Sequence, residues 1–595
     1  MISALWFAGI ILLPVTASYG IPIVYLAVVI LALAKFKKRP QADERSREAA
    51  YFIVGATSII ALIECASAYY WVTAAFAPQA LFGVASQNLE TNLTYAAYPI
   101  APLLLLIIMF SWVWVPIVGR LMPRLQASQI NAPAHSDNPV GRSMSDRRLL
   151  FLSLDVFAIL SILVFYFLYA AGQLWVVGVD SQWRYIIPLN ALNGSGFFHA
   201  LGASLSLGHG IYLGLLLIVE HVTGLSSFLV VKYAPLVLTF FTATLSFLAF
   251  RGVLSRNFPL LAALCMIFWI PTTIGIWSGI QSNWTAYALW IFFLACVFQY
   301  VKSRAASFLL QSLLSLGILV IHPWTWGVFL ATVILATLFG IRRRTDFKHG
   351  LTAVVSSIWL AAPIGAVAFI YLSGVSGDIR NAITLYLFPL AHVDLVFKLF
   401  PGAWLEMWRE WSSFLSPTLI LIALMGTFAL IELHGEMKRY LLAWVAVWCI
   451  GSILVAAIGY LPADAAISET QLWRMQYLSP LPILLALGVN KFVNLSPRFV
   501  ITGPSRVLGL QAAVLSAAIG ASCLPLFLFA TPIIRLACVM AGTLAVVLLT
   551  YHFHMKDSPK LMILTVLILI IMNAAFRSLF PLLLDPHNLI PPSSI

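Results

Sequence analysis

Residues 147–180 read "RRLLFLSLDVFAILSILVFYFLYAAGQLWVVGVD". Two arginines come first, then an almost unbroken apolar run that ends near position 172, and then a tail that closes on Asp180. A helix needs roughly 20 apolar residues to cross about 30 Å of hydrocarbon, and this run has that length. Because Arg and Lys gather on the cytoplasmic side of a membrane, the paired arginines predict that Asp180 lies on the outer side.

The composition extends this interpretation to the whole chain. Of its 595 residues, 62% are hydrophobic and 9% are charged, whereas soluble domains are close to half apolar and a quarter charged. A chain of this length could not bury so much apolar surface in one core, so lipid must act as its solvent. The six cysteines form no CxxC pair and no Cys/His cluster, which argues against a disulfide framework and a zinc site.

Sixteen stretches have the length and composition of membrane-spanning helices. They predict an all-α, polytopic integral membrane protein with about 16 transmembrane helices. The first stretch is too long for a signal peptide and no cleavage pattern follows it, so we expect it to be retained. The stretches are 10–34, 50–74, 97–119, 149–172, 226–250, 257–278, 283–301, 305–321, 326–341, 350–373, 414–432, 439–458, 476–493, 507–530, 532–552 and 561–582.

The basic residues are distributed regularly among the connections. Lys and Arg favour cytoplasmic loops, and 26 of the 34 basic residues fall in alternate connections between the sixteen stretches. This pattern predicts a multi-pass protein of the cell membrane whose N-terminus and C-terminus are both extracytoplasmic. It also explains the formal net charge of +13 by topology, which argues against nucleic acid as a partner.

Two regions do not fit a spanning helix. "LSLGHGIYLGLLLIVEHVTG", residues 205–224, is apolar for only about 13 residues, and counting it as a span would put the later basic clusters outside. We expect a juxtamembrane or re-entrant helix on the outer face. Region 379–411 mixes aromatic, His and charged residues, which is typical of an interfacial helix. The predicted external loops are 173–225, 374–413 and 459–475.

Eight basic residues fall on the predicted outer side, against the usual orientation rule. Among them are Arg184, Arg380 and Arg474. Because a guanidinium presents a planar fork of donors, an anionic group such as a lipid-linked phosphate would explain their position. The alternative is snorkelling, or pairing with an acid nearby, such as Asp180 four residues before Arg184.

Two predicted hairpin tips belong to the same outer surface. "IWSGIQSNWTAYALW" turns at residues 276–290, and "LVIHPWTWGVFL" turns at residues 319–330. Pro323 and the tryptophans that follow it place the second tip at the membrane interface, with His322 at the lipid boundary. His322 is a candidate phosphate donor or proton shuttle, and the alternative is that it caps a helix.

From about residue 149 onward the chain resembles the GT-C superfamily of multi-spanning glycosyltransferases, which includes the dolichyl-phosphate-mannose protein mannosyltransferases. The resemblance lies in the basic start, span and long loop that lead to Asp180, in the "WSGIQSNW" turn followed by "HPWTW", and in "QLWRMQYLSPLPILLALG", where Arg474 precedes a proline-containing span. It covers roughly three quarters of the chain. Relatives often carry paired acids in the first loop, whereas Asp180 is followed by Ser181 and Gln182.

The resemblance implies a membrane glycosyltransferase that moves a sugar from a polyprenyl-phosphate-linked donor to an acceptor at the extracytoplasmic face. In that chemistry Asp180 would be the catalytic general base that deprotonates the acceptor hydroxyl. Arg474, with Arg184, Arg380 and His322, would bind the phosphate of the leaving group. The implied partners are the lipid-linked sugar donor and the membrane lipids. No cofactor is indicated, and the question of a divalent metal stays open.

Two other functional classes stay open, a transporter or lipid flippase and a non-catalytic membrane subunit. A transporter needs broken helices and ionisable groups at mid-membrane, and Glu64 in the second stretch is a carboxylate at such a depth. The domain prediction has three parts: an N-terminal three-helix membrane module at 1–119, a cytoplasmic linker at 120–148 and a GT-C-like multi-spanning core at 149–595.

Overall fold

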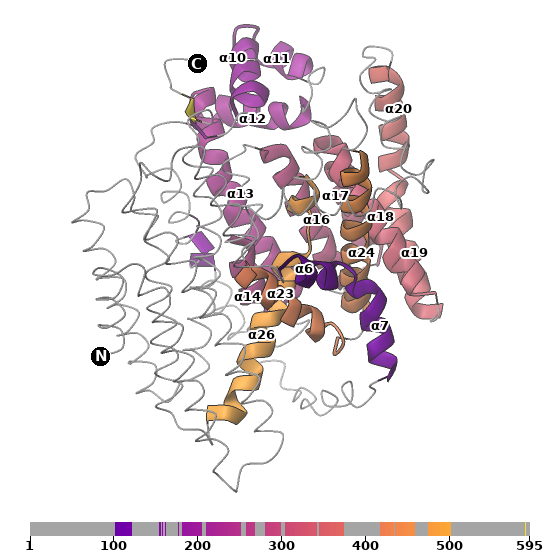
Figure 1. Cartoon of the computed structure of the whole chain (residues 1–595). Coiled ribbons are helices and arrows are strands. Elements are labelled where there is room, and N and C mark those ends of the chain that lie inside the picture. Colours follow the sequence, from indigo (N-terminus) through magenta and orange to yellow (C-terminus); the bar gives the residue numbers. More distant parts are fainter. Residues whose placement is uncertain are drawn as a thin grey trace, which may run out of the picture. The chain divides into compact units, whose positions relative to one another are not determined.

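The described part of the chain is helical (Figure 1). The computed structural model describes residues 101–121, 181–204, 210–251, 258–267, 280–298, 304–341, 344–373, 417–433, 435–458 and 474–500, a few positions between 154 and 161, and the pairs 176–177 and 589–590. Within these residues the regular structure is helical except for a two-residue antiparallel pair, β1 (Val176–Val177) with β2 (Leu589–Ile590). The all-α class is confirmed for this part of the chain.

The chain forms two compact units. Unit 1 comprises Met1–Leu105, Phe414–Gly426 and Leu487–Leu584, and unit 2 comprises Leu106–Ser413, Thr427–Ala486 and Asp585–Ile595. In unit 1 a Cβ added at Gly488 would collide with the backbone oxygen of Ile422, so only glycine fits at that contact. Most of the predicted N-terminal module, including Glu64, and the predicted cytoplasmic linker lie outside the described residues.

Unit 2 contains most of the described helices. They are η1 (Ser181–Ile186, a π-helix), α7 (Ser111–Leu121), α10 (Ile187–Asn193), α11 (Phe197–Ser204), α12 (Gly210–Thr223), α13 (Ser227–Phe250), α14 (Phe258–Ile267), α16 (Gln281–Phe298), α17 (Arg304–Ile321), α18 (Pro323–Phe339), α19 (Arg344–Ile358), α20 (Ala361–Ser373) and α24 (Gly435–Ile458). Three helices have residues in both units: α6 (Ala101–Met109), α23 (Pro417–Ala429) and α26 (Leu481–Val500).

Three helices among the described residues are long and apolar enough to cross a membrane: Ser227–Phe250, Asp346–Val367 and Gly435–Ala456. They coincide with the fifth, tenth and twelfth predicted stretches. α14, α17 and α18 are shorter apolar helices at three further predicted stretches. These helices support a membrane protein. The predicted stretches before residue 97 and after residue 506 lie outside the described residues.

Prolines divide two of the predicted spans. The stretch 350–373 breaks at Trp359, where α19 gives way to α20, and Pro363 lies four residues later. The stretch 476–493 breaks at Leu478, and Pro482 lies four residues later. Because a proline ring clashes with the carbonyl four residues before it and has no N–H to offer, a proline inside a helix kinks or interrupts it. A turn therefore interrupts the helix in each of these two stretches, while Asp346–Val367 as a whole remains long and apolar enough to cross a membrane.

Side chains from other helices bond the carbonyls that prolines leave without a helical partner. Pro235, inside α13, cannot donate to the Val231 carbonyl, and Gln281 Nε2 donates to that oxygen at 2.9 Å instead. The Leu478 carbonyl likewise accepts from Trp444 Nε1 at 2.6 Å. Because lipid offers no hydrogen bonds, a carbonyl at membrane depth needs such a partner from the protein. These two bonds tie α16 to α13 and α24 to the segment before α26.

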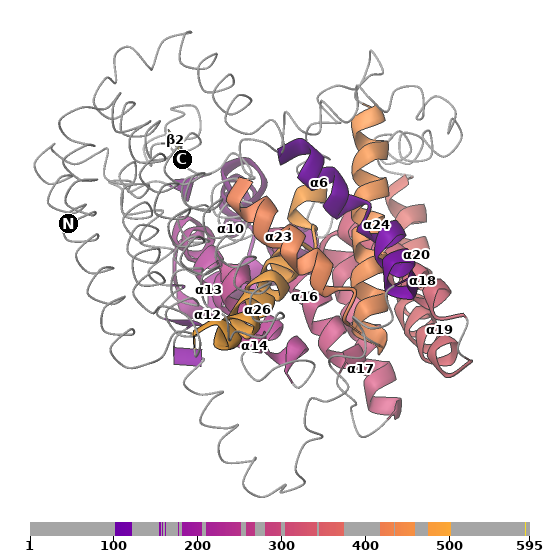
Figure 2. The same cartoon turned by 60° about the horizontal axis from the view of Figure 1, so that its bottom comes forward.

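The two ends of unit 2 are built from different elements: short helices lie at one end, and ion pairs join two helix starts at the other. At one end η1, α10, α11 and α12 lie where α13 begins (Figure 1). At the other end Arg439 pairs with Asp346 at 3.5 Å and with Glu436 at 3.7 Å, which ties the start of α24 to the start of α19. Between them α16, α17, α18, α19 and α24 pack side by side (Figure 2). Segments predicted outside and segments predicted in the cytoplasm therefore lie at opposite ends.

The first of these ends, which we call the loop end, contains the segment predicted as a juxtamembrane or re-entrant helix. There α12 is a helix of 14 residues, which at 1.5 Å per residue is about 21 Å long and too short to span the hydrocarbon. It packs into a small core with η1, α10 and α13 that includes Tyr185, Leu189, Leu213, Leu216 and Val230. The other predicted interfacial region, 379–411, lies outside the described residues.

Candidate functional site

A network of buried polar side chains joins the helices at the loop end. Its centre is Gln281, the first residue of α16, which is fully buried. The Gln281 amide donates to the Val231 carbonyl of α13, and its oxygen accepts from the Tyr212 hydroxyl of α12 at 3.0 Å. An amide with both its oxygen and its nitrogen bonded holds one orientation, so Gln281 locks α12, α13 and α16 together.

Two tyrosines carry this network into the first predicted external loop. The Tyr185 hydroxyl donates to Ser282 Oγ at 3.1 Å and accepts from Ser282 N at 3.2 Å. The Tyr185 and Tyr212 rings meet edge to face, with their centroids 5.2 Å apart. Burial raises the pKa of Tyr212 well above its usual value, and the neighbouring Tyr185 adds to this shift. Tyr212 therefore keeps its proton and remains a hydrogen-bond donor at neutral pH.

The next residue of α16 connects this network to the α17–α18 turn. Asn283 Oδ1 accepts from the Thr325 hydroxyl. His322 is the N-cap of α18: its Nδ1 accepts from Thr325 N at 3.3 Å and lies 2.8 Å from Thr325 Oγ1. The tips "WSGIQSNW" and "HPWTW", singled out in the sequence, therefore meet through side-chain hydrogen bonds.

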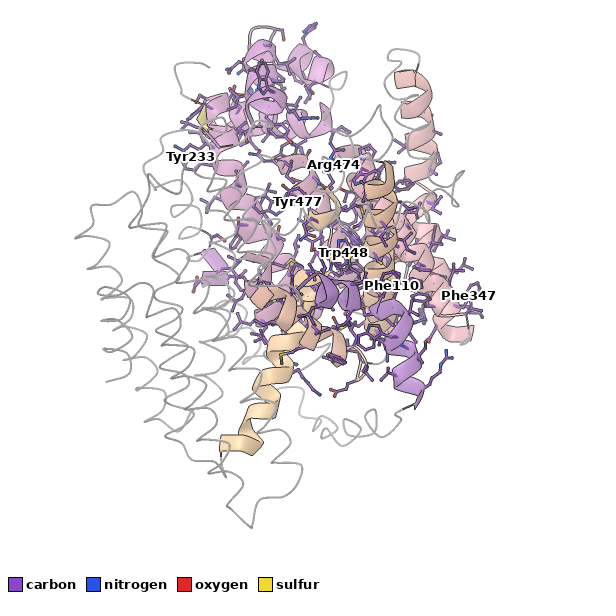
Figure 3. All side chains as sticks on the ribbon, viewed as in Figure 1. Phe110, Tyr233, Phe347, Trp448, Arg474 and Tyr477 are labelled. Atoms are coloured by element: carbon purple, nitrogen blue, oxygen red, sulfur yellow. The ribbon has the colours of Figure 1, made fainter. Side chains whose placement is uncertain are left out.

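The structure describes three of the five residues predicted for the site. Arg184 lies on η1 with an exposed side chain, next to the buried Tyr185. His322 is buried, and the structure confirms the helix-cap role that was its alternative explanation. Arg474 begins the short helical turn that ends at Tyr477, and its side chain is half-buried (Figure 3). The other two, Asp180 and Arg380, lie outside the described residues.

The structure connects the neighbours of two predicted site residues, Arg184 and His322, through hydrogen bonds. Arg184 is followed by Tyr185, which bonds to Ser282, while His322 and Thr325 reach the adjacent Asn283. The start of α16 is the common support. Arg474 belongs to a segment that packs against α24. The next residue, Met475, contacts α24 at Gly451, where it occupies the space that a larger side chain would need.

Sequence reasoning did not assign roles to Tyr185, Tyr212 or Gln281. A signal for Gln281 was present, because Gln, Ser and Asn in succession open an otherwise apolar helix, and Pro235 predicts an unbonded carbonyl for one of them to meet. The tyrosines gave no such signal, since an aromatic residue in an apolar run is most simply interpreted as core.

The acid Glu220 has a structural role at the same end. It accepts from Asn193 Nδ2 at 2.7 Å and from the Ser227 hydroxyl at 3.0 Å, which ties α10 to the junction of α12 and α13. Among the residues that the structure describes, no three His, Cys, Asp or Glu side chains come close enough to hold a metal ion. Comparison with protein-family models, with curated proteins and with solved structures finds no match to this chain.

Proposed function

We propose that the protein is a membrane glycosyltransferase of the GT-C type, which transfers a sugar from a polyprenyl-phosphate-linked donor to an acceptor at the extracytoplasmic face of the cell membrane. The observation that supports this proposal is the buried polar network at the loop end. It fastens the first predicted external loop to both predicted hairpin tips, at Ser282 and at Asn283. Polar groups buried in a chain of this composition are costly, and such groups commonly mark a functional region.

Asp180 is the proposed general base. The chain directly after it is fixed, because Ser181 is buried and Tyr185 is bonded to α16. A base has to be held within hydrogen-bond reach of the acceptor hydroxyl, so a firmly anchored loop suits this role. Once the base has taken the proton, the acceptor oxygen attacks the anomeric carbon and the lipid phosphate leaves.

The proposed phosphate-binding residues are Arg184, Arg380, Arg474 and His322. The departing phosphate gains negative charge, and donors placed beforehand in a dry site stabilise that charge more than water does. The arginines offer planar forks of N–H donors. The His322 ring is already held by Thr325 through Nδ1, so it would donate to the phosphate through Nε2.

Transfer assays with an Asp180→Asn variant test this function. Membranes that contain the full-length protein are supplied with polyprenyl phosphates bearing radiolabelled glucose, mannose or N-acetylglucosamine, and label in protein and glycan fractions is counted. We expect Asp180→Asn to lower transfer by about 10²- to 10⁴-fold, because the general base is lost. Asp155→Asn serves as the control, since the Asp155 side chain is exposed and has no proposed role. Undiminished transfer by Asp180→Asn would refute the assignment of the base.

A transporter or lipid flippase is the second candidate, and the proline-associated breaks at Trp359 and Leu478 favour it. Transporters often bind their substrate where helices are interrupted within the membrane. The same protein in proteoliposomes separates the two candidates. Movement of a labelled polyprenyl phosphate sugar between leaflets without any transfer would support the transporter, whereas transfer without movement would support the enzyme.

A further inference from the structure

Several buried side chains in the described part of unit 2 contain polar atoms without a hydrogen-bond partner, and among them are four amide or hydroxyl side chains on α16, on α24 and on the segment before α26. In Gln476, which is 2% exposed, neither the amide nitrogen nor the amide oxygen has one. The same holds for the hydroxyls of Ser479 and Ser452 and for the amide nitrogen of Asn283. Buried polar groups nearly always have a partner, so each group that lacks one requires a specific explanation, and a ligand that supplies the partners is one such explanation.

The stacking of aromatic residues shows how α16 and α24 run past each other. Phe298 meets Tyr440, with ring centroids 5.8 Å apart, and Trp290 meets Trp444 at 4.7 Å. Lower numbers on α16 therefore match higher numbers on α24, and the two helices are antiparallel. Tyr287, one turn nearer the loop end than Trp290, also meets Trp444, at 6.1 Å.

This register places two of the four groups on one side of Trp444. Asn283 lies one helical turn beyond Tyr287 towards the loop end. Ser452 lies about two helical turns after Trp444 on α24. Because α24 is antiparallel to α16, Ser452 also lies towards the loop end. Both are therefore within about 12 Å of the Trp444 level along the helix axes, on the loop-end side.

The other two groups lie on the segment that runs along α24 from Gly451 to Trp444. Met475 contacts the position of a side chain at Gly451, and the Leu478 carbonyl accepts from Trp444 Nε1. Gln476 and Ser479 share one turn of this segment, because Ser479 N donates to the Gln476 carbonyl at 3.2 Å. Side chains three residues apart on a helical turn are neighbours.

We propose that Gln476, Ser479, Asn283 and Ser452 form an internal binding site for the hydroxyl groups of a sugar. All four side chains are uncharged, and amides and hydroxyls both donate and accept, which matches the hydrogen-bonding capacity of neighbouring sugar hydroxyls. The ligand supplies the partners that the protein lacks. Its identity as the sugar of a lipid-linked donor rests on the proposed function: Arg474, the proposed phosphate ligand, precedes Gln476 by two residues.

Entry of a sugar requires the Gln476 side chain to move, and the segment that carries it is not part of a continuous helix. Pro480 and Pro482 follow it, and neither has an N–H to bond back along the chain. The Trp444 indole, not a helical N–H, holds the Leu478 carbonyl. The bond from the Trp444 indole stabilises the turn at Leu478 but does not require the turn to be part of a continuous helix.

The test compares two buried glutamines that differ in their partners. Gln311 is the matched control, because its nitrogen donates to Ser307 and its oxygen accepts from Ser356. We expect Gln476→Met to raise the Tm of the purified full-length protein by about 1–2 °C, since it removes an unpaired polar group, and Gln311→Met to lower it. A fall with Gln476→Met as large as with Gln311→Met would overturn the proposal.

Ligand binding is measured on the same samples as the rise in Tm with added probes. The probes are free methyl glycosides, undecaprenyl phosphate, and undecaprenyl phosphate bearing glucose, mannose or N-acetylglucosamine. Wild type and Gln311→Met should show an additional rise with a sugar-bearing probe over the sugar-free lipid, and Gln476→Met and Ser479→Ala should lose it. A rise in Tm with methyl glycosides alone would support the sugar-binding site but would refute the claim that its ligand is the sugar of a lipid-linked donor.

Failure of this inference can be separated from failure of the proposed function. If no probe shifts the Tm of the wild type, or if Gln476→Met and Ser479→Ala keep the full shift, the sugar site is wrong even where transfer activity is found. If Asp180→Asn transfers sugar as well as the wild type, the assignment of the base is wrong, while a shift that depends on Gln476 still supports the site.

Discussion

Trp444 shows how one side chain supports an interrupted helix. Its indole N–H donates to the Leu478 carbonyl, while its ring packs on Trp290 and Tyr287. Trp290 is equally buried, but its indole N–H has no hydrogen-bond partner. The two tryptophans therefore supply similar apolar contact, and they differ in the hydrogen bond.

This difference gives a prediction for two matched substitutions. Trp444→Phe and Trp290→Phe remove the same atoms from buried positions, but only Trp444→Phe leaves a carbonyl unpaired. We expect Trp444→Phe to lower the free energy of unfolding by about 1–3 kcal/mol more than Trp290→Phe. Denaturant or thermal unfolding in detergent measures both. Equal losses would mean that the bond to Leu478 adds nothing to stability.

Helices and their interruptions were not equally predictable from the sequence. The positions of α13, α16, α17, α18 and α24 follow the apolar stretches, because hydrophobic length sets where a helix can cross a membrane. The breaks at Trp359 and Leu478 were not predicted, since a hydropathy pattern counts proline only as one residue in a window. Pro363 and Pro482 did mark them, each four residues after the break.

The candidate site was predictable only in outline. The sequence indicated the two tips that meet at the start of α16, because polar and tryptophan-rich turns stand out between apolar runs. It could not show that Asn283 and Thr325 are the residues that join them. Nor could it reveal Gln476, because an unpaired buried amide can be recognised only from its surroundings.

The pairing of Gln281 with a freed carbonyl leads to a prediction about α13 as an element. Pro235→Ala restores an N–H that can bond Val231 within the helix, so Gln281 would no longer be needed as its donor. We expect Gln281→Met to destabilise the wild type more than it destabilises the Pro235→Ala variant, with a coupling of about 1 kcal/mol. Unfolding of the four proteins of this double-mutant cycle measures the difference. Additive effects would contradict the proposed exchange of partners.

At the scale of unit 2, two sets of polar interactions lie at opposite ends, with apolar helices between them. The loop end is joined by neutral hydrogen bonds around Gln281, and the opposite end is joined by ion pairs around Arg439. Lys and Arg favour the cytoplasmic loops of membrane proteins, so the predicted orientation would place the Arg439 end in the cytoplasm and the loop end outside. The proposed chemistry requires that orientation, because a lipid-linked donor is useful where no nucleotide sugar is present.

Labelling of single cysteines tests this orientation. Trp183 at the loop end and Lys348 near the opposite end both have exposed side chains, so Trp183→Cys and Lys348→Cys are placed separately in a full-length background whose native cysteines are replaced. A membrane-impermeant maleimide should label position 183 in intact cells and position 348 only in inside-out vesicles, because the predicted topology places the two ends on opposite sides of the bilayer. Labelling of both positions in intact cells would place both on the outer side of the membrane. That result would contradict the predicted topology on which the extracytoplasmic site depends.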